Sequence, residues 1–172
     1  MNLRIKGANM IIINSLNDLE KYKANETYNK KYDFLEKTYI FQNDSQLLDV
    51  EFNINLNFSF EEQEEQFETS LNTELFMYCF IANNVKFNKG CRIHKLIAKN
   101  LNSNITCDID DLEIENNINT NCLSCQSVIA KDIISNSVIV GNTISCHYIK
   151  TKKFLFNDLE FINLECQIKN KF

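Results

Sequence analysis

The sequence contains no proline and no tryptophan, and it has only three glycines among its 172 residues. Rossmann and P-loop nucleotide sites need glycine where the backbone approaches a phosphate, so the scarcity of glycine argues against both kinds of phosphate cradle. The absence of proline suits a chain in which every segment donates backbone hydrogen bonds to a neighbouring segment. In place of these residues, 26 asparagines and 21 isoleucines together make up more than a quarter of the chain.

Long apolar runs are also missing. No stretch reaches the roughly 18 consecutive apolar residues of a membrane-spanning helix, and no apolar leader with a small-residue cleavage site stands at the start. We therefore expect a cytoplasmic protein that does not enter a membrane. The apolar fraction of 44% is ordinary for a globular chain and argues against wholesale disorder.

The seven cysteines are an odd number, so they cannot all pair within the chain, and in a reducing cytosol we expect free thiols. A C-x-x-H and a C-x-x-C have the spacing of zinc ligands: Cys91, His94, Cys122 and Cys125. The alternative is that these are buried structural thiols, since free cysteine is among the most buried residue types. We predict no metal and no other cofactor, and we keep a zinc-stabilised interaction module as an alternative.

The N-terminal part predicts short elements of both kinds. Residues 10–13 form an apolar run typical of a strand. Ser15 and Asp18 resemble a capping box, and the residues after them fit a short helix that ends near residue 23. Residues 24–37 are polar and predict a loop or a second short helix, and residues 38–42 predict another strand.

Residues 50–60 alternate strictly between apolar and polar side chains. This period of two predicts a strand with one buried face, because a helix would spread the same apolar side chains around its axis. The acidic run EEQEEQFE follows at 61–68 and predicts a helix or a solvated loop. We interpret the region near 61–70 as an acidic insertion.

A short repeat begins near residue 80. The strings FIANN, LIAKN and VIAKD start at residues 80, 96 and 128, at intervals of 16 and 32 residues, and LEIEN at 112 keeps part of the pattern. Large apolar residues also recur at every fifth position in one run, which comprises Ile129, Ile134, Ile139, Ile144, Ile149, Phe154, Leu159 and Leu164.

A period of five fits neither a helix, with about 3.6 residues per turn, nor a flat strand, with a period of two. It fits a chain that turns a corner every five or six residues, so that three segments form one coil of about 16 residues. The sequence therefore predicts a mainly β protein, with a small N-terminal α/β cap at 1–48 and a parallel β-solenoid at 49–172. A spacing of four between Ile93 and Ile109 leaves a helix as the alternative for that stretch, although its Asn, Ser and Thr residues are poor helix formers.

Asparagines stand at the ends of the repeats. We expect them to turn the corners of the coil, because Asn tolerates left-handed backbone and hydrogen-bonds its own turn. The residues concerned are Asn84, Asn100, Asn104, Asn117, Asn136 and Asn142.

The repeats at about 80–166 resemble the pentapeptide-repeat proteins, which are four-sided β-solenoids with a central Leu or Phe and a small residue two positions before it. Here that small residue is replaced at several positions, for example by Asp132 and His147. The lead-in LNDLEKY (16–22) and the tracts after it are similar to short-repeat proteins of phages and low-GC bacteria. Some pentapeptide-repeat proteins bind gyrase, so the resemblance implies a non-enzymatic binding protein.

The net charge of -5 is an average over stretches of opposite sign. Residues 38–85 contain nine acids, residues 100–130 contain five, and neither stretch contains Lys or Arg. Carboxylates stacked about 4.8 Å apart on a solenoid can imitate the phosphates of DNA. The candidate partner-binding residues are Glu61, Glu62, Glu64, Glu65, Asp108, Asp110, Asp111 and Glu113.

From these residues we predict an inhibitor of the anti-CRISPR or gyrase-binding kind. Its partner would be a host or phage nucleic-acid-binding protein, such as a nuclease effector or a topoisomerase. Basic residues gather at 86–99 and in KTKK at 150–153, but four residues in an acidic protein are weak evidence, so direct binding of nucleic acid is not expected. His94 and His147 are the only imidazoles and lack a catalytic partner set, so we expect no enzyme. Alternatively, the acids only keep the protein soluble and bind no partner. A further alternative is a structural solenoid that assembles through its open ends, and a homodimer is left open.

Overall fold

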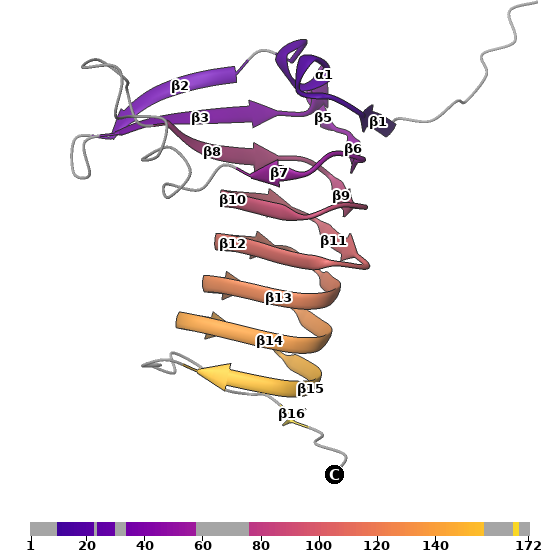
Figure 1. Cartoon of the computed structure of the whole chain (residues 1–172), viewed down its shortest axis with the longest axis vertical. Coiled ribbons are helices and arrows are strands. Elements are labelled where there is room, and N and C mark those ends of the chain that lie inside the picture. The colour runs from indigo at the N-terminus through magenta and orange to yellow at the C-terminus, as the bar shows by residue number, and fades with distance from the viewer. Residues whose placement is uncertain (1–9, 23, 30–33, 58–75, 157–166, 169–172) are drawn as a thin grey trace, which may run out of the picture.

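Apolar side chains recur at intervals of five or six residues from Phe80 to Ile149, and each of them lies inside a stack of parallel strands. The computed structural model describes residues 10–22, 24–29, 34–57, 76–156 and 167–168. These residues form a mainly β, parallel solenoid in which Lys95 lies beside Asp111 of the next coil, so one coil has about 16 residues. The predicted fold class is confirmed, and Figure 1 shows the coils as successive rungs.

Three faces run along the solenoid, and parallel ladders connect each face from coil to coil. The first face contains β1 (Met10–Ile13), β6 (Asp49–Phe52), β9 (Asn84–Phe87) and β11 (Asn100–Ser103), and it ends at β16 (Gln167–Ile168). The second face contains β7 (Leu56–Asn57) and the first residues of β10 (Cys91–Ala98) and β12 (Thr106–Ile114). The third face contains β3 (Phe34–Ile40), β8 (Phe76–Ile81) and the last residues of β10 and β12.

The later coils are built from long bent strands. β13 (Asn117–Ile129) and β14 (Asp132–Ser145) each contribute to all three faces, and β15 (Tyr148–Phe156) contributes to the first two. The backbone stays extended at the bends within β13 and β14, so each strand continues from one face to the next. Parallel pairing is therefore kept on both sides of such a bend, as between Thr120 and Ser135 and between Cys122 and Ser137.

The N-terminal end carries α1 (Leu16–Glu20) and an antiparallel hairpin of β2 (Ala24–Asn29) and β3 (Figure 1). The Oγ of Ser15 accepts a hydrogen bond from the Asp18 N–H at 3.2 Å, and the Asp18 carboxylate accepts one from the Asn14 N–H at 3.1 Å. The predicted N-cap at Ser15 is confirmed, but the Asp18 carboxylate bonds the N–H of Asn14 rather than that of Ser15, and the helix ends at Glu20 rather than near residue 23. A second, two-stranded hairpin consists of β4 (Gln42–Asn43) and β5 (Gln46–Leu47).

The prediction of a loop or helix at 24–37 was wrong, because this region contains the hairpin. β2 is polar because it lies at the edge of the sheet, where its only partner among the described strands is β3. β3 in turn pairs with β8, and β1 pairs with β6, so the sheet runs across the predicted domain boundary at residue 48. That boundary stays a prediction.

The alternation at 50–60 does not form one straight strand. Val50 and Phe52 are buried in β6 on the first face, and Leu56 is buried in β7 on the second face. The chain turns a corner between them at residues 53–55, while the inward and outward alternation continues. A period of two therefore identified the buried side chains correctly and missed the corner. Residues 58–60 lie outside the described residues.

The five-residue ladder was predicted one position out of phase at Ile129, Ile134 and Ile139, and it was predicted correctly at Ile144 and Ile149, which are buried. Ile129 and Ile134 are 57% and 46% exposed, whereas their neighbours Val128 and Ile133 are at most 1% exposed. The true inward ladder has steps of five and six and comprises Phe80, Val85, Cys91, Leu96, Leu101, Cys107, Leu112, Ile118, Leu123, Val128, Ile133, Val138, Ile144 and Ile149. Isoleucine occurs at both inward and outward positions, so residue type alone did not reveal the phase. Leu159 and Leu164 lie outside the described residues. The helix alternative for 93–109 is excluded, because β10, β11 and β12 occupy it.

The asparagines act between coils rather than within a turn. Among the described residues Asp44 is the only non-glycine residue with positive φ, so none of the described asparagines adopts left-handed backbone. The Asn100 side-chain amide donates to Asn84 Oδ1 at 2.7 Å, and that of Asn84 donates to Asp49 Oδ1 at 2.8 Å. Asn136 donates to Asn121 in the same way at 2.8 Å. Stacked side-chain amides thus join equivalent corners of adjacent coils.

Neighbouring isoleucines provide a test of the phase of the coil. Ile133→Ala should lower the free energy of unfolding by about 2–5 kcal/mol, because it leaves a cavity in the core. Ile134→Ala should change it by less than about 0.5 kcal/mol, since that side chain lies on the surface. Urea denaturation of both variants measures the difference. Similar losses in the two variants would contradict the described phase.

Candidate interaction surface

Two charged segments that are separate in the sequence lie on adjacent coils. Because one coil has about 16 residues, Arg92 of β10 lies beside Asp108 of β12, and Arg92 Nε approaches Asp108 Oδ2 to 2.9 Å. Lys95 Nζ lies 2.6 Å from Glu113 Oε1. His94 Nδ1 lies 3.2 Å from Asp110 Oδ2. Three of the four described candidate residues therefore have a basic partner in the preceding coil.

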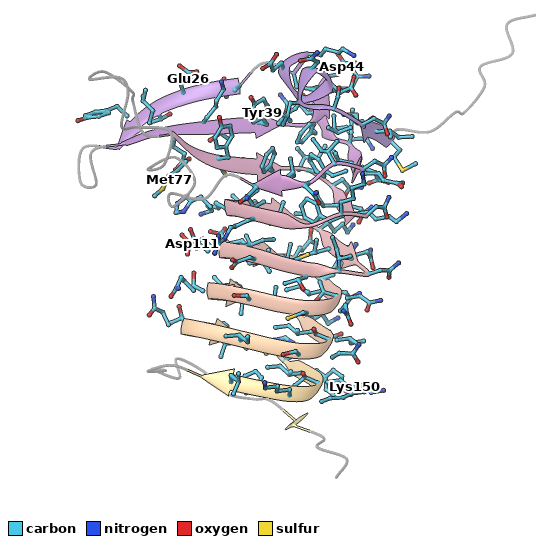
Figure 2. The ribbon with its side chains drawn as sticks, viewed as in Figure 1. Glu26, Tyr39, Asp44, Met77, Asp111 and Lys150 are labelled. Carbon is cyan, nitrogen blue, oxygen red and sulfur yellow. The ribbon has the colours of Figure 1, made fainter. Side chains whose placement is uncertain are left out.

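The remaining carboxylates of this coil are held differently. Asp111 accepts a hydrogen bond from Ser127 Oγ at 2.5 Å, and Figure 2 shows Asp111 at the margin of the stack, on the opposite side from Lys150. Glu115 is exposed, and within the described part of the chain it has no side-chain hydrogen bond or ion pair. We call the five acids of this coil the carboxylate band: Asp108, Asp110, Asp111, Glu113 and Glu115.

The cations at 86–99 equal the carboxylate band in number, since that segment contains four lysines and Arg92. The sequence did not show this balance, because the two groups are separated along the chain and become neighbours only through the coil. The ion pairs are exposed: the Arg92 and Asp108 side chains are 45% and 36% accessible. Pairs of this kind contribute about 0–1 kcal/mol, so a partner's cation can replace them at little cost. Glu61, Glu62, Glu64 and Glu65 lie outside the described residues.

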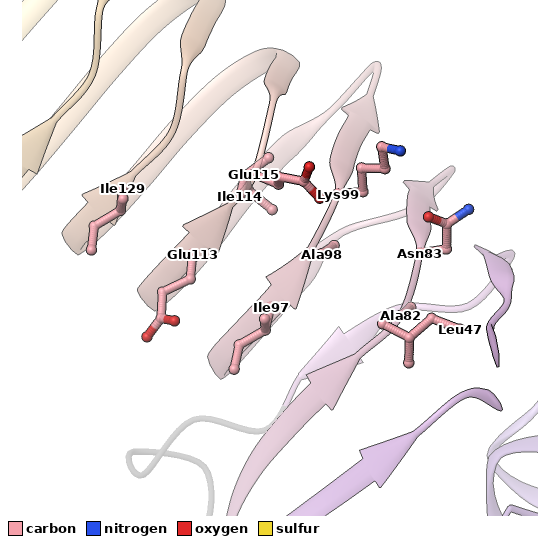
Figure 3. Close-up of a pocket in the computed structure, with 10 residues that line it drawn as sticks. All are labelled: Leu47, Ala82, Asn83, Ile97, Ala98, Lys99, Glu113, Ile114, Glu115 and Ile129. Carbon is pink, nitrogen blue, oxygen red and sulfur yellow. The ribbon is translucent and has the colours of Figure 1, made fainter. Parts of the chain in front are cut away.

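A groove of about 370 Å³ lies at the corner between the third and first faces (Figure 3). Its floor contains the buried Ala82, Ala98 and Ile114. Ile97, Glu113 and Ile129 stand in a row on successive strands along one side, and Leu47 lies at one end. The rest of the lining is polar and comprises Asn83, Lys99 and Glu115.

The groove explains the repeat found in the sequence. In each of the strings IANN, IAKN and IAKD, which begin at 81, 97 and 129, the isoleucine faces outward and the alanine lies on the buried inner side of the corner. The coil between them has Glu113 in the isoleucine position and Ile114 in the alanine position. The most regular part of the sequence therefore encodes a surface feature, and the core positions beside it vary among Phe80, Leu96, Leu112 and Val128.

The four zinc candidates do not come together. Cys91 is buried in the second face beside Cys107, while Cys125 lies in a later coil, in register with Val140. Successive strands are about 4.8 Å apart, so sulfurs two coils apart cannot share a zinc ion with Zn–S distances of about 2.3 Å. His94 faces outward to Asp110. Among the described residues no three His, Cys, Asp or Glu side chains are grouped to hold a metal ion.

Three buried thiols, those of Cys79, Cys91 and Cys125, are held in the neutral form because their pKa values are raised. Burial raises the pKa of Cys79 to about 11, and burial, reinforced by Asp108, Asp110 and Asp111, raises that of Cys125 to about 12. Burial also raises the pKa of Cys91 well above its usual range. Because a thiolate is the reactive form, these groups are packing residues rather than nucleophiles at neutral pH.

The raised pKa values of the buried thiols predict that the protein loses stability in alkali. Above about pH 9 the cysteines of the unfolded chain ionise while Cys79, Cys91 and Cys125 of the folded chain stay neutral, so these three lower the free energy of unfolding as the pH rises towards their folded pKa values. Under reducing conditions Cys125→Val should remove about 1–2 kcal/mol of the fall between pH 8.5 and 10.5. Urea denaturation at both pH values measures it. An identical fall in the wild-type protein and the variant would contradict the burial of this thiol.

The described residues include no helix with the length and apolarity needed to span a membrane. Comparison of the chain with protein-family models, with curated proteins and with solved structures finds no match.

Proposed function

We propose that the protein is a non-enzymatic binding protein that blocks a nucleic-acid-handling enzyme, such as a nuclease effector or a topoisomerase. The observation that supports this most is the carboxylate band, which places four acids on β12 and a fifth, Glu115, directly after it. Charge grouped on a rigid surface steers a partner of opposite charge and fixes its orientation. A cationic nucleic-acid channel is such a partner.

A partner's cation must compete with the ion pairs that the band already forms. A channel arginine that approaches Asp108 must compete with Arg92, and one that approaches Glu113 must compete with Lys95. The competition is most favourable at Asp108, because the Arg92–Asp108 pair is exposed and therefore weak, whereas Lys95 is partly buried beside Glu113. Asp110 and Glu115 add exposed acceptors beside them, and Glu115 lacks a competing cation in the described structure. We infer that the channel engages the band by exchange of ion pairs.

The finer part of the proposal rests on resemblance. Gyrase-binding pentapeptide-repeat proteins and inhibitors of the anti-CRISPR kind are possible models for a phage-type protein of this architecture, and this is an analogy at the level of the fold. The pairing of three strand segments per coil differs from the four-sided coil of the pentapeptide repeat. We therefore base the proposed activity on the band rather than on membership of that family.

Neutralising the band tests the proposal. The fourfold variant Asp108→Asn, Asp110→Asn, Asp111→Asn and Glu113→Gln keeps the size and most hydrogen-bond acceptors of the four side chains. We expect it to weaken inhibition of DNA gyrase or of an RNA-guided nuclease by roughly tenfold or more, and to reduce the salt dependence of inhibition.

A matched control removes the same number of acids elsewhere: Glu20→Gln, Glu26→Gln, Asp44→Asn and Asp132→Asn. Its inhibition should match that of the wild-type protein, and urea denaturation shows whether both variants stay folded. Equal inhibition by the band variant and the control, or no inhibition of either enzyme by the wild-type protein at saturation, would contradict the proposal.

A second candidate is a structural solenoid that assembles end to end. Within the described chain, β1 pairs only with β6 and β16 only with β15, so each end of the first face has an open strand edge. Met10 and Ile12 on β1 are 45% and 49% exposed. Such edges can pair with another copy. Sedimentation velocity over a range of concentrations should then show species that grow with concentration, whereas a monodisperse monomer or dimer contradicts assembly.

A further inference from the structure

We propose that the groove between the third and first faces binds one amphipathic α-helix of a partner protein. The helix would place aliphatic side chains against Ile97 and Ile129 and a lysine or arginine against Glu113. The proposal goes beyond the proposed action on nucleic-acid enzymes, and Glu113 and Glu115 are the two groups that both surfaces share.

The fold does not require isoleucine at the outward position that lines the groove. Register pairs Ile81 with Ile97, Ile97 with Glu113, and Glu113 with Ile129, so all four occupy one outward position in successive coils. Glu113 occupies this position without interrupting the ladder. A polar residue therefore suffices for folding, yet Ile129 leaves 57% of its surface exposed. A single exposed isoleucine is ordinary, but Ile97 and Ile129 line one cavity together, and contiguous apolar surface of this kind marks an interaction site.

The spacing between Ile97, Glu113 and Ile129 on successive coils favours an α-helix. Adjacent coils are about 4.8 Å apart, and an α-helix rises about 5.4 Å per turn. A helix that lies along the solenoid axis therefore presents about one side chain to each coil, as in other helix-in-groove complexes. An extended peptide presents same-face side chains about 6.6–6.8 Å apart and loses the match after one or two coils.

The acidic side chains at the groove favour a helix that carries a cation. Glu113 is the only acid in an otherwise aliphatic row, and its side chain is 45% accessible while it pairs with Lys95. Glu115 lies at the edge of the same groove. A cation on the third turn of the helix would contact both carboxylates, whereas an acid there would be repelled. Ala98 on the floor leaves room above it for a leucine or isoleucine of the helix.

The test uses a labelled synthetic peptide and the full chain. The peptide is amphipathic, with Leu, Leu, Lys and Leu on four successive helical turns of one face, and a second peptide carries this order in reverse. A scrambled peptide of the same composition is the negative control. Fluorescence anisotropy should show binding of one ordered peptide at least roughly tenfold tighter than the scrambled one.

Two variants locate the site. The pair Ile97→Ser and Ile129→Ser should weaken binding by roughly tenfold or more, while Ile134→Ser, which removes an isoleucine of similar exposure from the first face, should leave it unchanged. The double exchange Lys95→Glu and Glu113→Lys keeps the ion pair and should reverse the preference, so that a peptide with Glu in place of Lys binds better.

The helix proposal is overturned if no ordered peptide binds more tightly than the scrambled one, or if Ile134→Ser weakens binding as much as the groove variant. It is also overturned if the protein alone forms a dimer in sedimentation velocity that the groove variant dissociates, because a second copy would then occupy the groove. Inhibition of gyrase or of an RNA-guided nuclease by the Ile97→Ser, Ile129→Ser variant should stay at the wild-type level, so failure of this proposal leaves the proposed function to its own test.

Discussion

Parallel, in-register pairing between coils of nearly constant length is the interaction on which the rest of this structure depends. When residue 96 lies beside residue 112, every neighbouring side chain also lies beside its counterpart, and each position in the coil becomes a column. Most inward columns are apolar and form a continuous core, and one column consists of the buried hydroxyls of Ser103, Thr120 and Ser135. Outward columns repeat whatever chemistry one coil carries, which produces the amide contacts of Asn84 and Asn100 and the ion pairs between β10 and β12.

The columns survive small changes of coil length. Leu101 pairs with Ile118 and Ile118 with Ile133, offsets of 17 and 15 residues, and the register of the first face is kept. Between β13 and β14 the register shifts after Cys125, so that Gly141 and Asn142 both lie opposite Gln126. The amide end of the flexible Gln126 side chain lies close to where a Cβ at residue 141 would be, so this side chain packs against Gly141 at the bulge. Bulges of this kind let a solenoid absorb an extra residue without losing its core.

The sequence predicted the solenoid, its coil length and the capping of α1 because each of these is a local or periodic property. It did not predict the phase of the core, since Ile133 and Ile134 are the same residue type and differ only in which side of the strand they occupy. It also did not predict that Arg92 neutralises Asp108, because that contact depends on the coil as a whole. The IA repeat is visible in the sequence, but its meaning as the wall and floor of a groove depends on the register, which places Ile97 outward and Ala98 inward.

The two proposed surfaces follow from the same columns, one through charge and the other through exposed isoleucines, so the phase of the coil is the central claim. Methyl–methyl nuclear Overhauser effects in a selectively labelled sample test it most directly, because they report contacts within about 5 Å, close to the spacing of strands. The register of the coils predicts a chain of cross-peaks from Leu101 through Ile118 and Ile133 to Ile149, with Ile129 and Ile134 absent from it. Cross-peaks that join Ile129 and Ile134 to this core, with Ile133 outside it, would contradict the account.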